Sequence, residues 1–206
     1  MSRRPVADRA KSRRVTVGIL ALQGDFVEHK AMLQGLDVAV REVRLPQQLE
    51  GLDGLVVPGG ESTTIARLLD IYALRGPLTQ MARRGLAVWG TCAGMILMAR
   101  SLDDDSLQPL GLMDIRVARN AFGRQVDSFE ADLVVKYLGD EPFAAVFIRA
   151  PLVSEVGEGV EVLASLADGR PVAVKQGRFL ATAFHPELTS DTRFHRYFLD
   201  LVADSG

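Results

Sequence analysis

The sequence predicts an α/β fold, a single domain with a central mixed, mostly parallel sheet flanked by helices. Three observations lead to this prediction. The chain has 206 residues, 48% of them hydrophobic and 24% charged, which suits one globular domain with a sizeable core. From residue 15 onward, short β-branched runs alternate with longer segments of helical period, as expected for a parallel sheet covered by helices. The second half carries strand-like runs separated by turn sequences, which indicates hairpins.

In the first half, the elements follow from apolar runs and helix-start signals. Pro58-Gly59-Gly60 ends a short apolar run, and the polar residues Glu61–Thr64 suit the free N–H groups of a helix start. We therefore expect, in chain order, a strand at Val15–Leu22, a helix from about Phe26 to Gln34, strands near Val38–Val43 and at Gly54–Val57, a helix opening at Glu61, a strand at Leu86–Trp89 and an apolar helix at Met95–Arg100.

In the second half, short strands predominate. The turn sequences Asp168-Gly169-Arg170 and Gln176-Gly177-Arg178 are typical of hairpins. The expected strands are Ile115–Arg119, Ala131–Lys136, Ala144–Arg149, Glu161–Leu166, Pro171–Lys175 and Phe179–Phe184. Phe194, Tyr197, Phe198 and Leu201 share one helical face and predict a closing helix.

Charge and cysteine content narrow the class of protein. Residues 1–14 hold six basic side chains against Asp8, and we expect this extension to be disordered, with the domain spanning residues 15–206. The remainder is acidic, which argues against general nucleic-acid binding. No apolar run is long enough to span a bilayer and no secretion signal is expected, so we expect no membrane association. The single cysteine, Cys92, excludes an internal disulfide and favours a reducing compartment, the cytoplasm.

Cys92 is the candidate nucleophile. Gly90-Thr91-Cys92-Ala93-Gly94 has the form of a nucleophile elbow, glycine-flanked and placed between an expected strand and an expected helix. The glycines permit a tight turn that exposes the side chain, and the start of the following helix favours a thiolate. A lone cysteine is more often a small buried core residue, but the two glycines and the strand-to-helix position favour a functional one.

His185 is the candidate base among three histidines. It follows an expected strand, and Glu187 lies two residues further on, so both side chains can point to the same side. His29 and His195 lie in expected surface helices, and we expect both on solvated faces.

The loop Pro58–Ser62 supplies the third element of a site. Its glycine pair leads into an expected helix, where backbone N–H groups can hold an oxyanion or a carboxylate. No Lys-Ser/Thr pair follows the glycines and no G-x-G-x-x-G fingerprint is present, so the sequence does not favour nucleotide binding. A plain structural turn is the alternative for this segment taken alone.

Together, the Cys92 elbow, His185-x-Glu187 and the Pro58–Ser62 loop resemble the class I, triad-type glutamine amidotransferases, which share a flavodoxin-like architecture. Longer strings resemble one branch of that family, the glutaminase subunits of pyridoxal 5′-phosphate synthase, or PdxT family. The resemblance runs from about residue 15 to 202. It rests on Leu22–Asp25, Pro58–Thr64, Arg119–Glu130, Phe147–Pro151 and Phe184–Thr189.

The resemblance implies hydrolysis of L-glutamine to glutamate and ammonia, with the ammonia passed to the synthase subunit, PdxS. It implies that Cys92 is the nucleophile, that His185 is the general acid and base, and that Glu187 orients the His185 imidazole. The implied oxyanion hole is formed by the N–H groups of Gly60 and Ala93. The residues implied to hold substrate are Gly60, Glu61, Ser62, Arg119, Ile148 and Arg149. Neither a cofactor nor a metal is implied.

Two other classes of protein stay open from the sequence. One is a related enzyme, such as the glutaminase subunit of imidazole glycerol phosphate synthase or a cysteine hydrolase. The other is a non-catalytic scaffold of the same fold. The long string Arg119–Glu130 speaks against the first, and an intact nucleophile, base and orienter speak against the second. The polar stretch Asn120–Glu130 is in addition a candidate for partner contact or loop closure.

Overall fold

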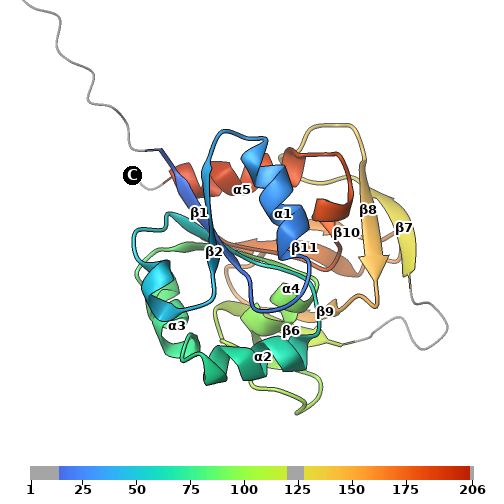
Figure 1. Ribbon diagram of the computed structural model, residues 1–206. Coiled ribbons are helices and arrows are strands. Elements are labelled where there is room, and N and C mark those ends of the chain that lie inside the picture. Colours follow the sequence, from blue (N-terminus) through green and yellow to red (C-terminus); the bar gives the residue numbers. More distant parts are fainter. Residues whose placement is uncertain (1–13, 120–127, 205–206) are drawn as a thin grey trace, which may run out of the picture.

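A computed structural model describes residues 14–119 and 128–204, and its central element is a seven-stranded sheet (Figure 1). The strands lie in the order β10-β11-β12-β4-β3-β1-β2. In chain order they are β1 (Thr16–Leu20), β2 (Ala39–Val43), β3 (Gly54–Val57), β4 (Ala87–Thr91), β10 (Glu161–Ser165), β11 (Pro171–Gln176) and β12 (Phe179–Thr182).

Most pairs in this sheet are parallel. Strands β2, β1, β3, β4 and β12 run in one direction, and β10 and β11 extend the β12 edge as antiparallel hairpins. Strands β3 and β4 are buried along their whole length, because helices cover both faces. The predicted α/β domain with a mixed, mostly parallel sheet is confirmed.

Helices cover the sheet on two sides. Figure 1 shows α1 and α5 on one side and α2 and α4 on the other, and α3 follows α2. The bounds are α1 (Phe26–Gln34), α2 (Ser62–Ile71), α3 (Arg75–Arg83), α4 (Ala93–Met98) and α5 (Arg193–Ala203), with short 3₁₀ turns η1 (Pro46–Leu49) and η2 (Pro186–Leu188). Phe194, Phe198 and Leu201 are buried on the inner face of α5, as their spacing predicts.

Five strands of the described chain lie outside the central sheet. A three-stranded sheet has the order β5-β6-β9, and a two-stranded hairpin joins β7 to β8. Their bounds are β5 (Ala99–Leu102), β6 (Met113–Ala118), β7 (Ser128–Leu133), β8 (Phe143–Ile148) and β9 (Leu152–Val156). Strands β6 and β8 alternate more and less buried residues, a pattern that identifies a strand in a sequence but does not say which sheet it joins, whereas β5 and β9 do not alternate and are not among the expected strands.

Some expected elements differ from the structure. The helix at 26–34 and the strand at 54–57 are confirmed, whereas the strand expected at Ala131–Lys136 occupies Ser128–Leu133. The helix expected at 95–100 begins at Ala93 and ends at Met98, where β5 follows directly. No element is predicted from the sequence at residues 75–83, where the structure has helix α3. Gly76 and Pro77 disfavour the interior of a helix, but both lie in the first turn of α3, where backbone N–H groups have no partner inside the helix.

Two segments named from the sequence lie wholly or largely outside the described residues. They are the basic extension, expected at residues 1–14, and the polar stretch from Asn120, of which the structure describes only residues 128–130. Within residues 14–119 and 128–204, no helix has the combined length and apolar character needed to cross a membrane.

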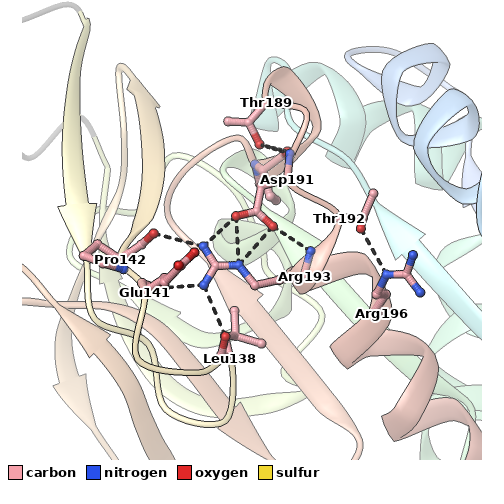
Figure 2. A network of polar contacts seen from close by, with 9 residues as sticks. Leu138, Glu141, Pro142, Thr189, Asp191, Thr192, Arg193 and Arg196 are labelled. Atoms are coloured by element: carbon pink, nitrogen blue, oxygen red, sulfur yellow. Dashed lines mark hydrogen bonds and ion pairs between the residues drawn. The ribbon is translucent and has the colours of Figure 1, made fainter.

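Arg193, the first residue of α5, ties the β7–β8 hairpin to the segment that follows η2 (Figure 2). Its guanidinium donates to the carbonyl oxygens of Leu138, Glu141 and Pro142 at 3.2, 2.7 and 2.9 Å. It also pairs with the Asp191 carboxylate at 2.6 Å. Because one planar cation meets four acceptors, the connection between the loop and the helix is rigid.

We predict that Arg193→Lys destabilises the fold by about 1–3 kcal/mol, since an ammonium group cannot reproduce this fork of donors. Chemical denaturation monitored by circular dichroism measures the change. Arg196→Lys is the matched control, because Arg196 donates from Nε to Thr192 Oγ1, at 3.1 Å, on an exposed surface. Equal stability of the two variants would contradict the anchoring role of Arg193.

Candidate active site

The carboxyl ends of β1, β3, β4 and β12 meet at one edge of the sheet, and a cavity of about 370 Å³ opens there. This edge is where open α/β sheets bind ligands. Residues expected from the sequence form most of the wall: Gly60, Glu61, Ser62, Cys92, Ala93, Arg119, Ile148, Arg149 and His185. Five further residues complete it, namely Gln23, Gly24, Asp25, Ile96 and Leu188. The structure thus brings nine of the predicted residues together around one space.

Cys92 lies at a strained turn between β4 and α4. Its backbone has φ 47° and ψ −104°, a left-handed region that residues with a side chain rarely adopt. The Cys92 N–H donates to Thr182 O at 2.8 Å, which fixes the turn to β12. A methyl group at Gly94 would collide with the Val57 carbonyl, so the elbow needs glycine there. The Cys92 Sγ lies 3.8 Å from Ile148 O.

His185 follows β12 and is held from both sides. Its backbone N–H donates to Val146 O in β8 at 2.8 Å, and its Nδ1 lies 2.8 Å from Glu187 Oε1. Asp25 Oδ2 lies 3.4 Å from the same nitrogen. A carboxylate at Nδ1 places the proton on that nitrogen and turns Nε2 outward, which is the arrangement of a triad base.

The electrostatics at His185 favour its charged form. Burial would lower the pKa of His185, but hydrogen bonds with Asp25, Cys92 and Glu187 outweigh burial and raise that pKa far above its ordinary value. Burial would raise the pKa of Glu187, but attraction to His29 and the hydrogen bond with His185 keep it well below its usual range. The pair therefore consists of an imidazolium and a carboxylate near neutral pH.

The expectation that His29 and His195 lie on solvated faces is wrong. Both side chains are fully buried, between the sheet and helices α1 and α5. His29 Nδ1 lies 3.1 Å from His195 Nε2, and His29 Nε2 lies 3.2 Å from Glu187 Oε2. A signal was present in the sequence, because His195 precedes Phe198 by three residues and His29 precedes Leu33 by four, spacings that share a buried helical face.

The glycine loop is fixed by the segment after β1. Gly60 has φ 148°, and Glu61 N–H donates to Gln23 Oε1 at 2.7 Å. The Gly59 carbonyl accepts from Asp25 N–H at 3.2 Å. Because a trans peptide points its C=O and N–H in opposite directions, the Gly60 N–H faces away from Asp25 in this arrangement. The Gly59–Gly60 peptide is therefore the part of the loop whose rotation would redirect an N–H.

Charged side chains of both signs line the other wall of the cavity. Glu61 caps α2, and hydrogen bonds from Thr63 and Thr64 lower the pKa of Glu61 to about 2. Arg119 Nη2 lies 3.9 Å from Glu61 Oε1, and the Arg119 side chain is only 16% exposed. Arg149 sits beside Ile148 with φ 44°, a second strained residue at the cavity.

Asp25, His185 and Glu187 also have the residue types of a metal site. Their ligand atoms lie within 4.8 Å of one another. The Nδ1 of His185 is already engaged by Glu187 at 2.8 Å, and Glu187 by two histidines, so the donor set is used for ion pairs within the protein. The geometry accordingly fits a proton-transfer site better than a metal centre.

Asp25 is a site residue that the sequence reasoning missed. It belongs to the string Leu22–Asp25, which carried the resemblance without a role for any of its residues. The carboxylate reaches His185 only because β1 and β12 end at the same edge of the sheet, although more than 150 positions separate the two residues in sequence. The contact of Gln23 with Glu61 could not be predicted from the sequence for the same reason.

Known proteins resemble this chain over most of its length. Pyridoxal 5′-phosphate synthase subunit PdxT of Herpetosiphon aurantiacus is 61% identical over 190 residues, which cover 91% of this chain and all of that protein. The protein of the same name from Dehalococcoides mccartyi (strain BAV1) is 56% identical and covers 90% of this chain and 96% of its own length.

Solved structures similar to this chain indicate the same fold and family. One described as a glutamine amidotransferase superposes with a TM-score of 0.86 at 53% identity, covering 91% of this chain and 98% of that one. PurLQS from Thermotoga maritima shares the fold alone, with a TM-score of 0.67 at 14% identity. The family profile described as the SNO glutamine amidotransferase family matches residues 19–204. The resemblance drawn from the sequence is confirmed, and the chain belongs to the SNO glutamine amidotransferase family.

Proposed function

We propose that this chain is the glutaminase subunit of a pyridoxal 5′-phosphate synthase. It hydrolyses L-glutamine to L-glutamate and ammonia and delivers the ammonia to the synthase subunit, PdxS. The observation that carries the proposal is that Cys92 and His185 line the 370 Å³ cavity and that Glu187 pairs with His185, in a chain 61% identical to a PdxT subunit. A reduced thiol at Cys92 fits a cytoplasmic enzyme.

The reaction begins at Cys92. Its thiolate attacks the carboxamide carbon of glutamine, and the new C–S bond converts the carbonyl oxygen into an oxyanion. Backbone N–H groups of Ala93 and Gly60 receive this charge. The raised pKa of His185 supports a thiolate, because an adjacent imidazolium stabilises the negative sulfur.

His185 moves the protons in both half-reactions. As the C–N bond breaks, the imidazolium donates a proton to the departing nitrogen, and ammonia leaves behind a glutamyl thioester on Cys92. The neutral imidazole then takes a proton from water, whose oxygen attacks the thioester and releases glutamate. Glu187 keeps Nδ1 protonated throughout, so that the other ring nitrogen performs each transfer.

The cavity wall suits a free amino acid. Arg119 and Arg149 supply guanidinium groups for the α-carboxylate of glutamine, and the ionised Glu61 suits its α-ammonium group. Gly60, Ser62 and Ile148 complete the binding wall. Opposite charges on adjacent side chains complement a zwitterion, which supports glutamine over a larger peptide amide.

A glutaminase subunit of another amidotransferase, such as imidazole glycerol phosphate synthase, is the second candidate. The relatives compared above carry the PdxT name at 56–61% identity, which favours the pyridoxal 5′-phosphate branch. A non-catalytic scaffold has less support, because scaffolding does not require a strained cysteine turn beside a paired histidine.

We predict that Cys92→Ala and Cys92→Ser lower glutamine hydrolysis by at least about 10³-fold, since the thiolate is both nucleophile and leaving group. Glutamate release, measured in the presence of the synthase subunit, tests this. Both variants should melt as the wild type does. Wild-type turnover in either variant would exclude the proposed mechanism.

Alkylation provides a second prediction. The imidazolium of His185 should allow iodoacetamide to modify Cys92 rapidly near pH 7, below the pKa of about 8.5 of a free thiol. Mass spectrometry of the Cys92 peptide over a pH series gives the rate. Glutamine should slow the reaction, and His185→Gln should shift the rate profile toward that of a free thiol. A wild-type rate that rises only near pH 8.5, without protection by glutamine, would indicate an inert core cysteine instead.

The third prediction concerns the partner. The bond from Asp25 N–H to the Gly59 carbonyl turns the Gly60 N–H away from Asp25, and we expect docking of PdxS to rotate this peptide and complete the oxyanion hole. Adding synthase subunit at saturating glutamine should raise kcat. Steady-state glutamate production by the chain alone and with increasing partner measures it, and equal rates would indicate a constitutive glutaminase.

A further inference from the structure

The second carboxylate oxygen of Glu187 has an unusual environment. Oε1 pairs with His185, whereas Oε2 is buried and meets no well-aligned hydrogen-bond donor among the described residues. What Oε2 does meet is the ring of His29, whose Nε2 lies 3.2 Å away. Both side chains are completely shielded from solvent. An ionised oxygen in such a place depends on whatever positive potential the protein supplies.

The same nitrogen of His29 also reaches the residue before the nucleophile. His29 Nε2 lies 3.1 Å from Thr91 Oγ1, and Thr91 immediately precedes Cys92. An ionised carboxylate only accepts hydrogen bonds, so a bare nitrogen facing Glu187 would be repelled and Nε2 must carry the proton. One N–H therefore faces both the orienting carboxylate and the strand that carries the nucleophile.

The opposite side of the His29 ring is held as well. Its Nδ1 lies 3.1 Å from His195 Nε2, and burial together with repulsion by His29 lowers the pKa of His195 to about 3, so His195 is neutral. Trp89 packs edge-on against both imidazoles, with ring centroids 5.4 and 4.9 Å away. The ring of His29 can therefore neither rotate nor withdraw without disturbing α5 and β4.

We propose that His29 is a positioning residue for glutamine hydrolysis: it holds the Glu187 carboxylate in place, so that His185 faces Cys92. This inference rests on the proposed function. His29 touches neither the cavity nor a reacting atom and acts through Glu187 alone. Loss of its Nε2–H leaves the carboxylate free to turn and raises the pKa of Glu187, because burial is then opposed only from the His185 side.

A matched pair of substitutions separates this role from packing. In His29→Gln the amide nitrogen reaches the place of Nε2, whereas in His29→Asn it reaches only that of Nδ1 and faces His195. We expect His29→Asn to lower kcat by about 10- to 100-fold and to change KM less than about twofold. A loss of this size corresponds to one interaction with a charged group. His29→Gln should stay within about threefold of the wild type. All rates are measured with the synthase subunit present.

The pH profile gives a readout that packing alone would not move. The titratable groups around Glu187 are His29 from α1, Asp25 before α1, His185 at the cavity and His195 from α5, which lies behind His29. A depressed Glu187 pKa preserves activity as pH falls, so the acid limb of kcat/KM should move to higher pH in His29→Asn and remain in place in His29→Gln. Trp89→Phe damages the same core without contacting Glu187 and should leave the acid limb unchanged.

A double-mutant cycle decides the matter even if His29→Asn folds poorly alone. In the Glu187→Gln background, where no buried carboxylate remains, adding His29→Asn should change kcat less than about twofold. Independent, multiplicative losses would overturn the proposal, as would equal effects of Asn and Gln at position 29. If the wild-type complex does not hydrolyse glutamine, the proposed function is refuted. If the wild-type complex is active and His29→Asn has the same kcat, only this inference is refuted.

Discussion

The buried carboxylate of Glu187 is the constraint around which this molecule is organised. An ion removed from water costs several kcal/mol unless positive or donating groups surround it. The chain meets that requirement with His185 on one oxygen and His29 on the other. These partners come from different elements, so satisfying one charge fixes α1 and η2 against the central sheet, and His195 adds α5. The arrangement that orients the His185 imidazole is thus also a packing requirement of the core.

Backbone strain at the cavity is maintained by the same sheet. Cys92 and Arg149 both have positive φ, and conformations of this kind persist only where the surroundings determine them fully. Strand β12 holds the Cys92 turn through the Thr182 carbonyl, and Gly94 lets α4 approach β3 closely. The parallel strands therefore do more than bring residues together, because they keep Cys92 at the cavity in an otherwise unfavourable turn.

The β7–β8 hairpin contributes to the site from outside the central sheet. Strand β8 ends with Ile148, whose carbonyl lies 3.8 Å from the Cys92 sulfur, and Val146 accepts the backbone N–H of His185. Arg193 joins the far end of this hairpin to the segment after η2. Two connections thus hold the hairpin beside Cys92 and His185, which explains how a strand of a separate sheet can form part of the cavity wall.

The fold class, the family and most residues of the cavity wall could be predicted from the sequence, because the patterns that indicate them are local. A glycine-flanked cysteine between a strand and a helix, and a histidine two residues from a glutamate, are patterns within a few positions. Contacts between distant elements could be seen only in three dimensions: Asp25 at His185, the burial of His29 and His195, and the separate sheets of the second half. Periodicity shows which face of an element is buried, but a polar residue on that face is recognised only when the partner that satisfies it is in place.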